Sequence, residues 1–162
     1  MKKIVLFLLL VAGSAFAFEI NKAQIDLFKK ESAALRQAID DMMSVTLGRG
    51  MTEFTKAAYL EGYGAVFTLE VSLEPTRSPF SSPKTPAEVR AVVAERRKAI
   101  ENKLESLLKQ RAESFQSLGP ADALSVVVHV FNSNPVDVPD LPSEIVFTVK
   151  KQDPTQVLIR AY

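Results

Sequence analysis

The feature that most constrains the fold is a long helical segment with a strand-like segment on either side. Thr85-Pro86-Ala87-Glu88 is a helix-start pattern, with a threonine N-cap, a proline at the first helical position and a glutamate three residues after the cap. Apolar residues then recur at helical spacing to about Ser117, and Gly119-Pro120 ends the pattern. A strand, a long helix and a second strand predict a crossover that lies along a sheet.

The segments around this helix predict strands. Ala58–Leu73 alternates between larger apolar residues on one face and glycine, valine or polar residues on the other, which predicts one long, half-buried strand. A bend or bulge is expected near Gly62 and Gly64, because glycine inside a strand weakens its regular geometry. Ala123–Phe131 is apolar on both faces, which is typical of a central strand.

The remaining elements complete a small α+β domain. A first helix is predicted from about Asn21, a candidate N-cap, to Val45, and two more strands are predicted over Glu144–Lys151 and Gln156–Tyr162. The element order is α-β-α-β-β-β. We therefore expect a two-layer sandwich, with two long helices on a mostly antiparallel four-stranded sheet.

Residues 1–17 have the three parts of a secretory signal peptide. Lys2 and Lys3 are basic, Ile4–Val11 is an unbroken apolar run, and Ala15-Phe16-Ala17 is a small-x-small cleavage pattern. The apolar run is too short to span a bilayer, which takes about 20 residues. We expect cleavage after Ala17, a single globular domain over residues 18–162, and an exported, soluble protein in the periplasm or outside the cell.

Composition removes several classes of partner. The chain has no cysteine, so it is not a lipoprotein, and its stability cannot depend on disulfides. Lys and Arg number 20 against 19 Asp and Glu, a balance that argues against nucleic acid or an anionic membrane as an electrostatic partner. No segment of the mature chain is apolar enough to suggest a membrane span.

The residue types that carry catalysis do not form a defensible motif. His129 is the only histidine, and Ser125 is four residues away along the same predicted strand, too far for a nucleophile–base pair. One histidine and no cysteine give little support for a zinc site. No glycine-rich phosphate loop is present. The sequence therefore predicts no catalytic residue, no cofactor and no metal ligand.

The sheet face away from the helices is the one candidate site. If Phe67, Leu69, Val126 and Val128 face the helices, the opposite face carries a mainly apolar set, and its glycines would let another surface approach the backbone. Large exposed apolar patches usually mark interfaces. The candidate interface residues are Leu60, Gly62, Gly64, Val66, Val127, His129 and Phe131.

These observations favour a non-catalytic, exported binding or protein-interaction module. Its expected partner is another protein or a second copy of the chain, bound through the outer sheet face. Two alternatives stay open. One is a small exported hydrolase whose acidic residues and His129 converge only in three dimensions, and the other is a carrier that holds an apolar ligand between helices and sheet.

The predicted signal peptide over residues 1–17 can be tested directly. Exported protein should begin at Phe18, because signal peptidase cleaves after the small residue that ends the Ala15-Phe16-Ala17 pattern. N-terminal sequencing of the exported material measures this directly. An intact Met1 on exported protein would contradict the assignment.

Overall fold

The protein is an α+β sandwich in which two helices lie on a five-stranded sheet. The structure, a computed structural model, describes residues 22–48, 50–75, 82, 84–133 and 135–162. The predicted leader, the Asn21 cap and much of the loop before Thr85 lie outside these residues. The elements, in chain order, are α1 Lys22–Leu47, β1 Lys56–Leu60, β2 Gly64–Ser72, α2 Pro86–Ser114, β3 Ala123–Phe131, β4 Glu144–Lys150 and β5 Asp153–Ala161.

The predicted single strand over Ala58–Leu73 is wrong, because the chain reverses within it. β1 and β2 pair antiparallel, with Leu60 opposite Gly64. Tyr63 N–H donates to the Leu60 carbonyl at 3.1 Å and closes the turn. Gly62 in this turn has φ +74°, a left-handed conformation that glycine adopts without steric cost. The expected bend is therefore a hairpin, and the sheet has five strands where four were predicted.

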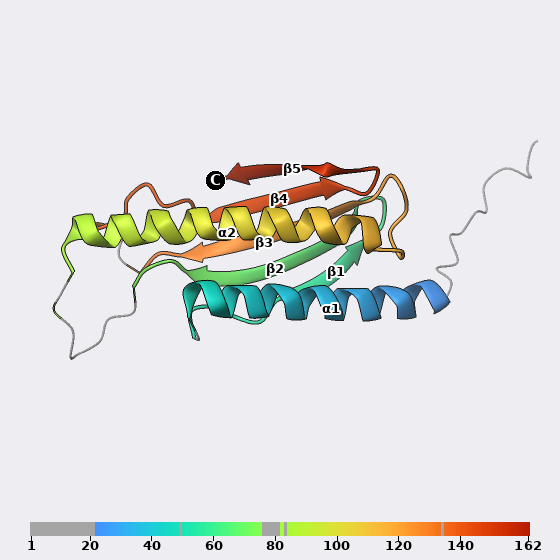
Figure 1. Cartoon of the computed structure of the whole chain (residues 1–162), viewed down its shortest axis with the longest axis horizontal. Helices are drawn as coiled ribbons and strands as arrows, with labels where there is room; N and C mark the ends of the chain where they lie inside the picture. The colour runs from blue at the N-terminus through green and yellow to red at the C-terminus, as the bar shows by residue number, and fades with distance from the viewer. Residues whose placement is uncertain (1–21, 49, 76–81, 83, 134) are drawn as a thin grey trace, which may run out of the picture.

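The strand order is β1-β2-β3-β4-β5, with one parallel pair at β2 and β3. The other neighbours pair antiparallel, including β3 with β4 and β4 with β5. The sheet is thus mixed. Parallel neighbours need a crossover connection, because the chain must return to the end of the sheet where the first strand began before the second strand can start. α2 provides that return between β2 and β3 (Figure 1).

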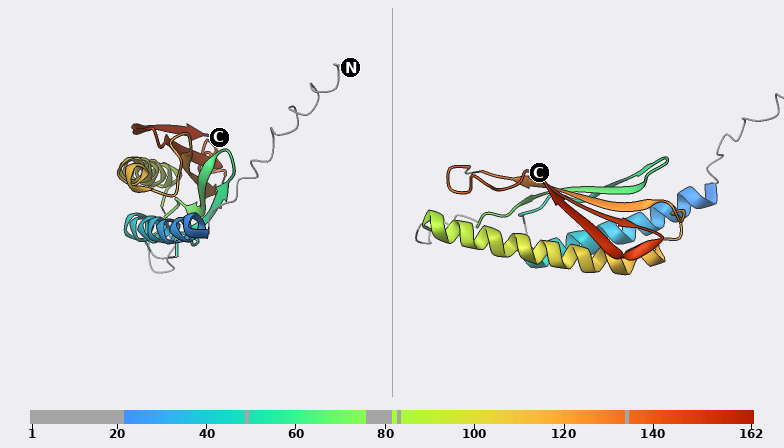
Figure 2. Two further views of the ribbon diagram at one scale, coloured as in Figure 1. Left: turned by 90° about the vertical axis from the view of Figure 1, so that its right-hand side faces the viewer. Right: turned by 90° about the horizontal axis from the view of Figure 1, so that it is seen from above.

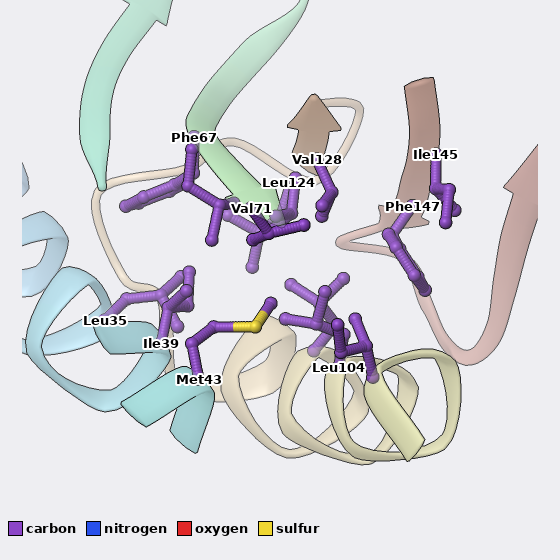
Figure 3. Packing of buried hydrophobic residues seen from close by; sticks show 14 of the residues in the cluster. Leu35, Ile39, Met43, Phe67, Val71, Leu104, Leu124, Val128, Ile145 and Phe147 are labelled. Carbon is purple, nitrogen blue, oxygen red and sulfur yellow. The ribbon is translucent and has the colours of Figure 1, made fainter. Parts of the chain in front are cut away.

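Both helices cover the same face of the sheet (Figure 2). Their buried residues lie along one side of each helix, at steps of three, four or seven positions, and meet the alternate, inward residues of the strands (Figure 3). Phe67 of β2 and Phe147 of β4 are fully buried at the centre of this layer. The helical contribution comes from Leu35, Ile39, Met43 and Leu47 of α1 and Val93, Ile100, Leu104, Leu108 and Ala112 of α2.

The start of α2 is the predicted capping box. Glu88 N–H donates to the Thr85 hydroxyl at 3.3 Å, and Thr85 N–H donates to the Glu88 carboxylate at 2.7 Å. The backbone N–H of Thr85, and then its hydroxyl, lower the pKa of the Glu88 carboxyl because both hydrogen bonds favour the ionised form. The cap fixes where the crossover helix begins.

The end of α2 comes earlier than predicted, at Ser114 in place of Ser117. Phe115 turns into the core and is 3% exposed. The Glu31 carboxylate of α1 then accepts the backbone N–H groups of Gln116 and Ser117, at 2.7 and 3.0 Å. Donors past the end of α2 are therefore paired with the neighbouring helix, and the chain can turn toward β3.

Replacing Thr85 with alanine should lower the free energy of unfolding by about 0.5–2 kcal/mol, because α2 loses its N-cap acceptor. Equilibrium denaturation followed by circular dichroism measures the change. Thr85→Ser keeps the hydroxyl and is the matched control, so it should stay close to wild type. Equal stability of Thr85→Ala and wild type would show that the cap does not stabilise α2.

Candidate functional site

The sheet face opposite the helices is the candidate site. Strand side chains alternate, so residues that pair with the outward positions of β2 share its outward face. In Figure 2 no helix lies over this face. The face carries Lys56, Ala58 and Leu60 of β1, Gly64, Val66, Thr68, Glu70 and Ser72 of β2, Ala123, Ser125, Val127, His129 and Phe131 of β3, Glu144, Val146, Thr148 and Lys150 of β4, and Leu158 and Arg160 of β5.

The apolar part of this face is widest across the middle strands. Val66, Val127 and Val146 are half-buried by their neighbours on the sheet. Larger apolar side chains stand at the margins, where Leu60 is 49% exposed, Phe131 55% and Leu158 52%. Exposed apolar groups on one face lose contact with water when another surface covers them. The geometry therefore suits binding of an apolar or mixed surface.

A hydroxyl network crosses one end of the face. Tyr63 Oη lies 2.7 Å from Ser125 Oγ, and Ser125 Oγ lies 3.0 Å from Thr148 Oγ1. Ser125 lies on the face that no helix covers, yet it is only 1% exposed because neighbouring residues of the sheet surround it. Both bonds satisfy the Ser125 hydroxyl inside the sheet surface. This serine is part of the face's structure and is not presented as a free nucleophile.

The only histidine is paired with an acid on the neighbouring strand. His129 Nδ1 lies 3.2 Å from Glu144 Oε1, and their side chains are 45% and 43% exposed. Glu70 of β2 is the register partner of His129 on the other side, so the three residues form a row across the face. Exposed pairs of this kind contribute little to stability. The row gives the face a charged boundary next to Phe131.

The structure brings together every predicted interface residue except one. Leu60, Gly64, Val66, Val127, His129 and Phe131 share the open face, and Gly62 lies in the β1–β2 turn.

Gly64 does not leave the open gap that the sequence suggested. It is buried, with φ +123°, and a Cβ atom built on it would lie 2.2 Å from the Ala123 carbonyl oxygen. The close approach at Gly64 is therefore already occupied by β3 of the same chain. This glycine shapes the site from within and is not a docking point for a partner backbone.

Sequence reasoning missed the residues that depend on the hairpin and on strand order. The alternation predicted over Ala58–Leu73 puts Tyr63 on the same face as Phe67, but its hydroxyl bonds Ser125 on the open face. The two glycines that flank Tyr63, in Glu61-Gly62-Tyr63-Gly64, were the only local signal for a turn. The strand pairings of β3, β4 and β5 also bring Glu144, Thr148 and Leu158 to the open face, and no local sequence pattern predicts these pairings.

A tyrosine–acid pair lies near the turn of the β1–β2 hairpin. Tyr59 Oη donates to Asp122 Oδ2 at 3.2 Å, and the same oxygen accepts the Gly119 N–H at 2.9 Å. Burial first, and then the nearby Asp122 carboxylate, raise the pKa of Tyr59, because both disfavour its charged form. The pair fastens the start of β3 to β1 on the helical side of the sheet.

Within the described ranges, no group of three or more histidine, aspartate or glutamate side chains is arranged to hold a metal ion. Neither α1 nor α2, the helices that the structure describes, is long and apolar enough to cross a membrane. Comparison of the chain with protein-family models, with curated proteins and with solved structures finds no match. Inference about function therefore starts from the geometry of the open face.

Gly64→Ala should lower the free energy of unfolding by about 3 kcal/mol or more, because a methyl group would combine backbone strain with overlap against β3. Gly62→Ala is the matched control, since it also has positive φ but meets nothing within 4 Å. It should cost about 1 kcal/mol, the penalty of the left-handed conformation. Urea denaturation of both variants measures the difference, and equal losses would contradict the close β2–β3 approach at Gly64.

Proposed function

We propose that this protein is an exported, non-catalytic interaction module that binds another protein through the open face of its sheet. One observation carries the proposal: both helices cover one face, while the opposite face presents Leu60, Phe131 and Leu158 at about half exposure. Water-exposed apolar area on a rigid sheet favours association, at about 25 cal/mol per Å² buried before the costs of binding.

The charges around the face favour a protein partner over a polyanion. Lys56, Lys150 and Arg160 are on the face together with Glu70 and Glu144, so both signs of charge are present beside its apolar residues. A nucleic-acid or anionic lipid surface would be attracted by a predominantly basic face. Mixed charges beside apolar residues resemble the rim and core of protein–protein interfaces.

Export is the second part of the proposal. It is supported by the basic start, apolar run and small-x-small pattern of residues 1–17. The absence of cysteine from the chain leaves no residue for N-terminal lipid attachment after cleavage. We propose that the processed chain acts in the periplasm or outside the cell, where its partner would also be found.

The hydrolase and carrier alternatives require different features: a reactive group beside His129 for the first and a bound apolar ligand for the second. The hydrolase alternative expects acidic residues to converge on His129, and Glu144 does lie beside it. The Ser125 hydroxyl, however, is bonded to Tyr63 and Thr148 and is 1% exposed, so it does not provide a free nucleophile. A carrier would release bound lipid or another apolar molecule when the purified protein is denatured and analysed by mass spectrometry.

Site-specific photo-crosslinking tests the proposed binding face. A photoreactive phenylalanine at position 131, on the face, should give a crosslinked product in the native host. The same residue at position 54 is the matched control, because Phe54 is 86% exposed but precedes β1 and is not on the face. The mass of the product distinguishes another protein from a second copy of the chain.

The crosslink at position 131 should also depend on the rest of the face. Adding Leu60→Glu should reduce its yield roughly tenfold, because a charge would be buried against the partner. No crosslink at position 131, or equal yields at positions 131 and 54, would contradict binding through the open face.

A further inference from the structure

Strand β5 is a long sheet edge with few of the features that prevent strand pairing. It is the last strand in the order, and among the described residues only β4 pairs with it (Figure 1). Natural edge strands are usually short, charged, bulged or interrupted by proline. In β5, Pro154 and the bulge opposite Val149 and Lys150 are confined to the start, and Arg160 is the only charged residue after Pro154. The other edge, β1, has five residues and starts at Lys56.

The backbone hydrogen bonds to β4 show which groups of β5 point outward. Tyr162 N–H donates to the Glu144 carbonyl at 3.0 Å, and Glu144 N–H donates to the Tyr162 carbonyl at 3.4 Å. In an antiparallel pair such bonded positions alternate with non-bonded ones. Arg160 and Leu158 therefore bond to β4, while the N–H and C=O groups of Val157, Ile159 and Ala161 point away from the sheet.

We propose that β5 is a self-association edge, which pairs antiparallel with β5 of a second copy about a two-fold axis at Leu158. This register places Val157 opposite Ile159 of the second copy, so that their outward backbone groups can exchange hydrogen bonds. Leu158 faces Leu158 of the second copy as a non-bonded pair, where side chains approach most closely.

The side chains of β5 favour a second copy over an unrelated strand. In the proposed register, Val157 and Ile159 meet on the helical side, where both are half-buried and would become covered. Gln156 meets Arg160 of the second copy, and Pro154 meets Tyr162, so no two like charges are opposite each other. The part of β5 from Gln156 to Arg160 thus provides compatible partners when it is reversed against itself.

Pairing at this edge would join two sheets into one surface. A two-fold axis perpendicular to the sheet keeps both pairs of helices on one side and both open faces on the other. The inference does not depend on the proposed partner binding, since strand pairing uses the outward backbone groups of β5, although Leu158 also lies on the open face. If both are correct, the dimer presents two binding faces side by side.

Sedimentation equilibrium measures the dimer dissociation constant and tests pairing through β5 with charged variants of Leu158, the residue at the proposed two-fold axis. The protein should begin at Phe18, which retains every element of the described fold. Because one strand edge is a small interface, the wild type should dimerise with a micromolar dissociation constant, measurable up to about 100 µM protein. Leu158→Lys and Leu158→Glu should each weaken the dimer roughly tenfold or more, since like charges would face each other.

An equimolar mixture of these two variants gives the decisive result. Lysine would then face glutamate, so a heterodimer should form with a dissociation constant within about threefold of wild type. Leu158 is 52% exposed in the monomer, and circular dichroism should show that both variants fold. Recovery of association in the mixture identifies position 158 as its own partner across the axis.

Two further variants separate the edge from other contacts. Leu60→Lys places the same charge on the open face at the opposite edge and should leave the dimer intact. Ala161→Pro removes an outward N–H that makes no bond to β4, and should weaken the dimer roughly threefold or more. A monomeric wild type at about 100 µM, a dimer unaffected by Leu158→Lys, or a dimer equally weakened by Leu60→Lys would overturn the proposal.

Discussion

The parallel pairing of β2 and β3 is the constraint on which the rest of the structure depends. Gly64 permits the two strands to approach at their shared start, and Ala123 N–H donates to the Tyr63 carbonyl at 2.7 Å there. Because both strands run in the same direction, the chain must return along the sheet between them, and α2 makes that return. α1 and α2 then cover one face together, and the opposite face is left for the functional contacts proposed for it.

Polar contacts between helices and loops hold the ends of this arrangement. The Glu31 carboxylate accepts from Gln116 and Ser117 at the end of α2, and Asp40 accepts from the N–H and hydroxyl of Thr55 before β1. Near the far end of β2, the Glu74 carboxylate accepts from the N–H and hydroxyl of Ser133 after β3. Apart from the exposed bond to Gln116, these bonds are partly buried, so removing either partner would leave an unsatisfied charge or donor, at a cost of about 1–3 kcal/mol each. They connect α1 to the segments before β1 and after α2, and the segment after β2 to the segment after β3.

The sequence predicted the helices, the capping box and the three C-terminal strands, because each has a local pattern. The hairpin was missed for a specific reason: odd-numbered residues face inward both before the turn, at Tyr59, and after it, at Phe67. The alternation therefore continues across the reversal and gives no sign of it. Only the glycines indicated a turn, and their positive φ angles became evident with the structure.

The candidate face was predictable by alternation, and its details were not. Val66, Val127 and Phe131 follow from which residues of β2 and β3 enter the core. The pairing of His129 with Glu144 and the Tyr63–Ser125–Thr148 network depend on strand order and register, which are set by contacts far apart in the sequence. The parallel pairing of β2 with β3 agrees with the crossover that the strand–helix–strand order predicts, whereas the additional edge strand β1 followed from the missed hairpin.

Nuclear magnetic resonance of the isotopically labelled protein tests the central pairing most directly. The account predicts contacts between backbone protons of Phe67 and those around Val126, in the evenly staggered pattern of a parallel ladder. It also predicts Ala57 opposite Phe67 on the other side, in an antiparallel ladder. Close pairs of Hα protons between β2 and β3, which are typical of antiparallel strands, would contradict the parallel pair and with it the origin of the open face.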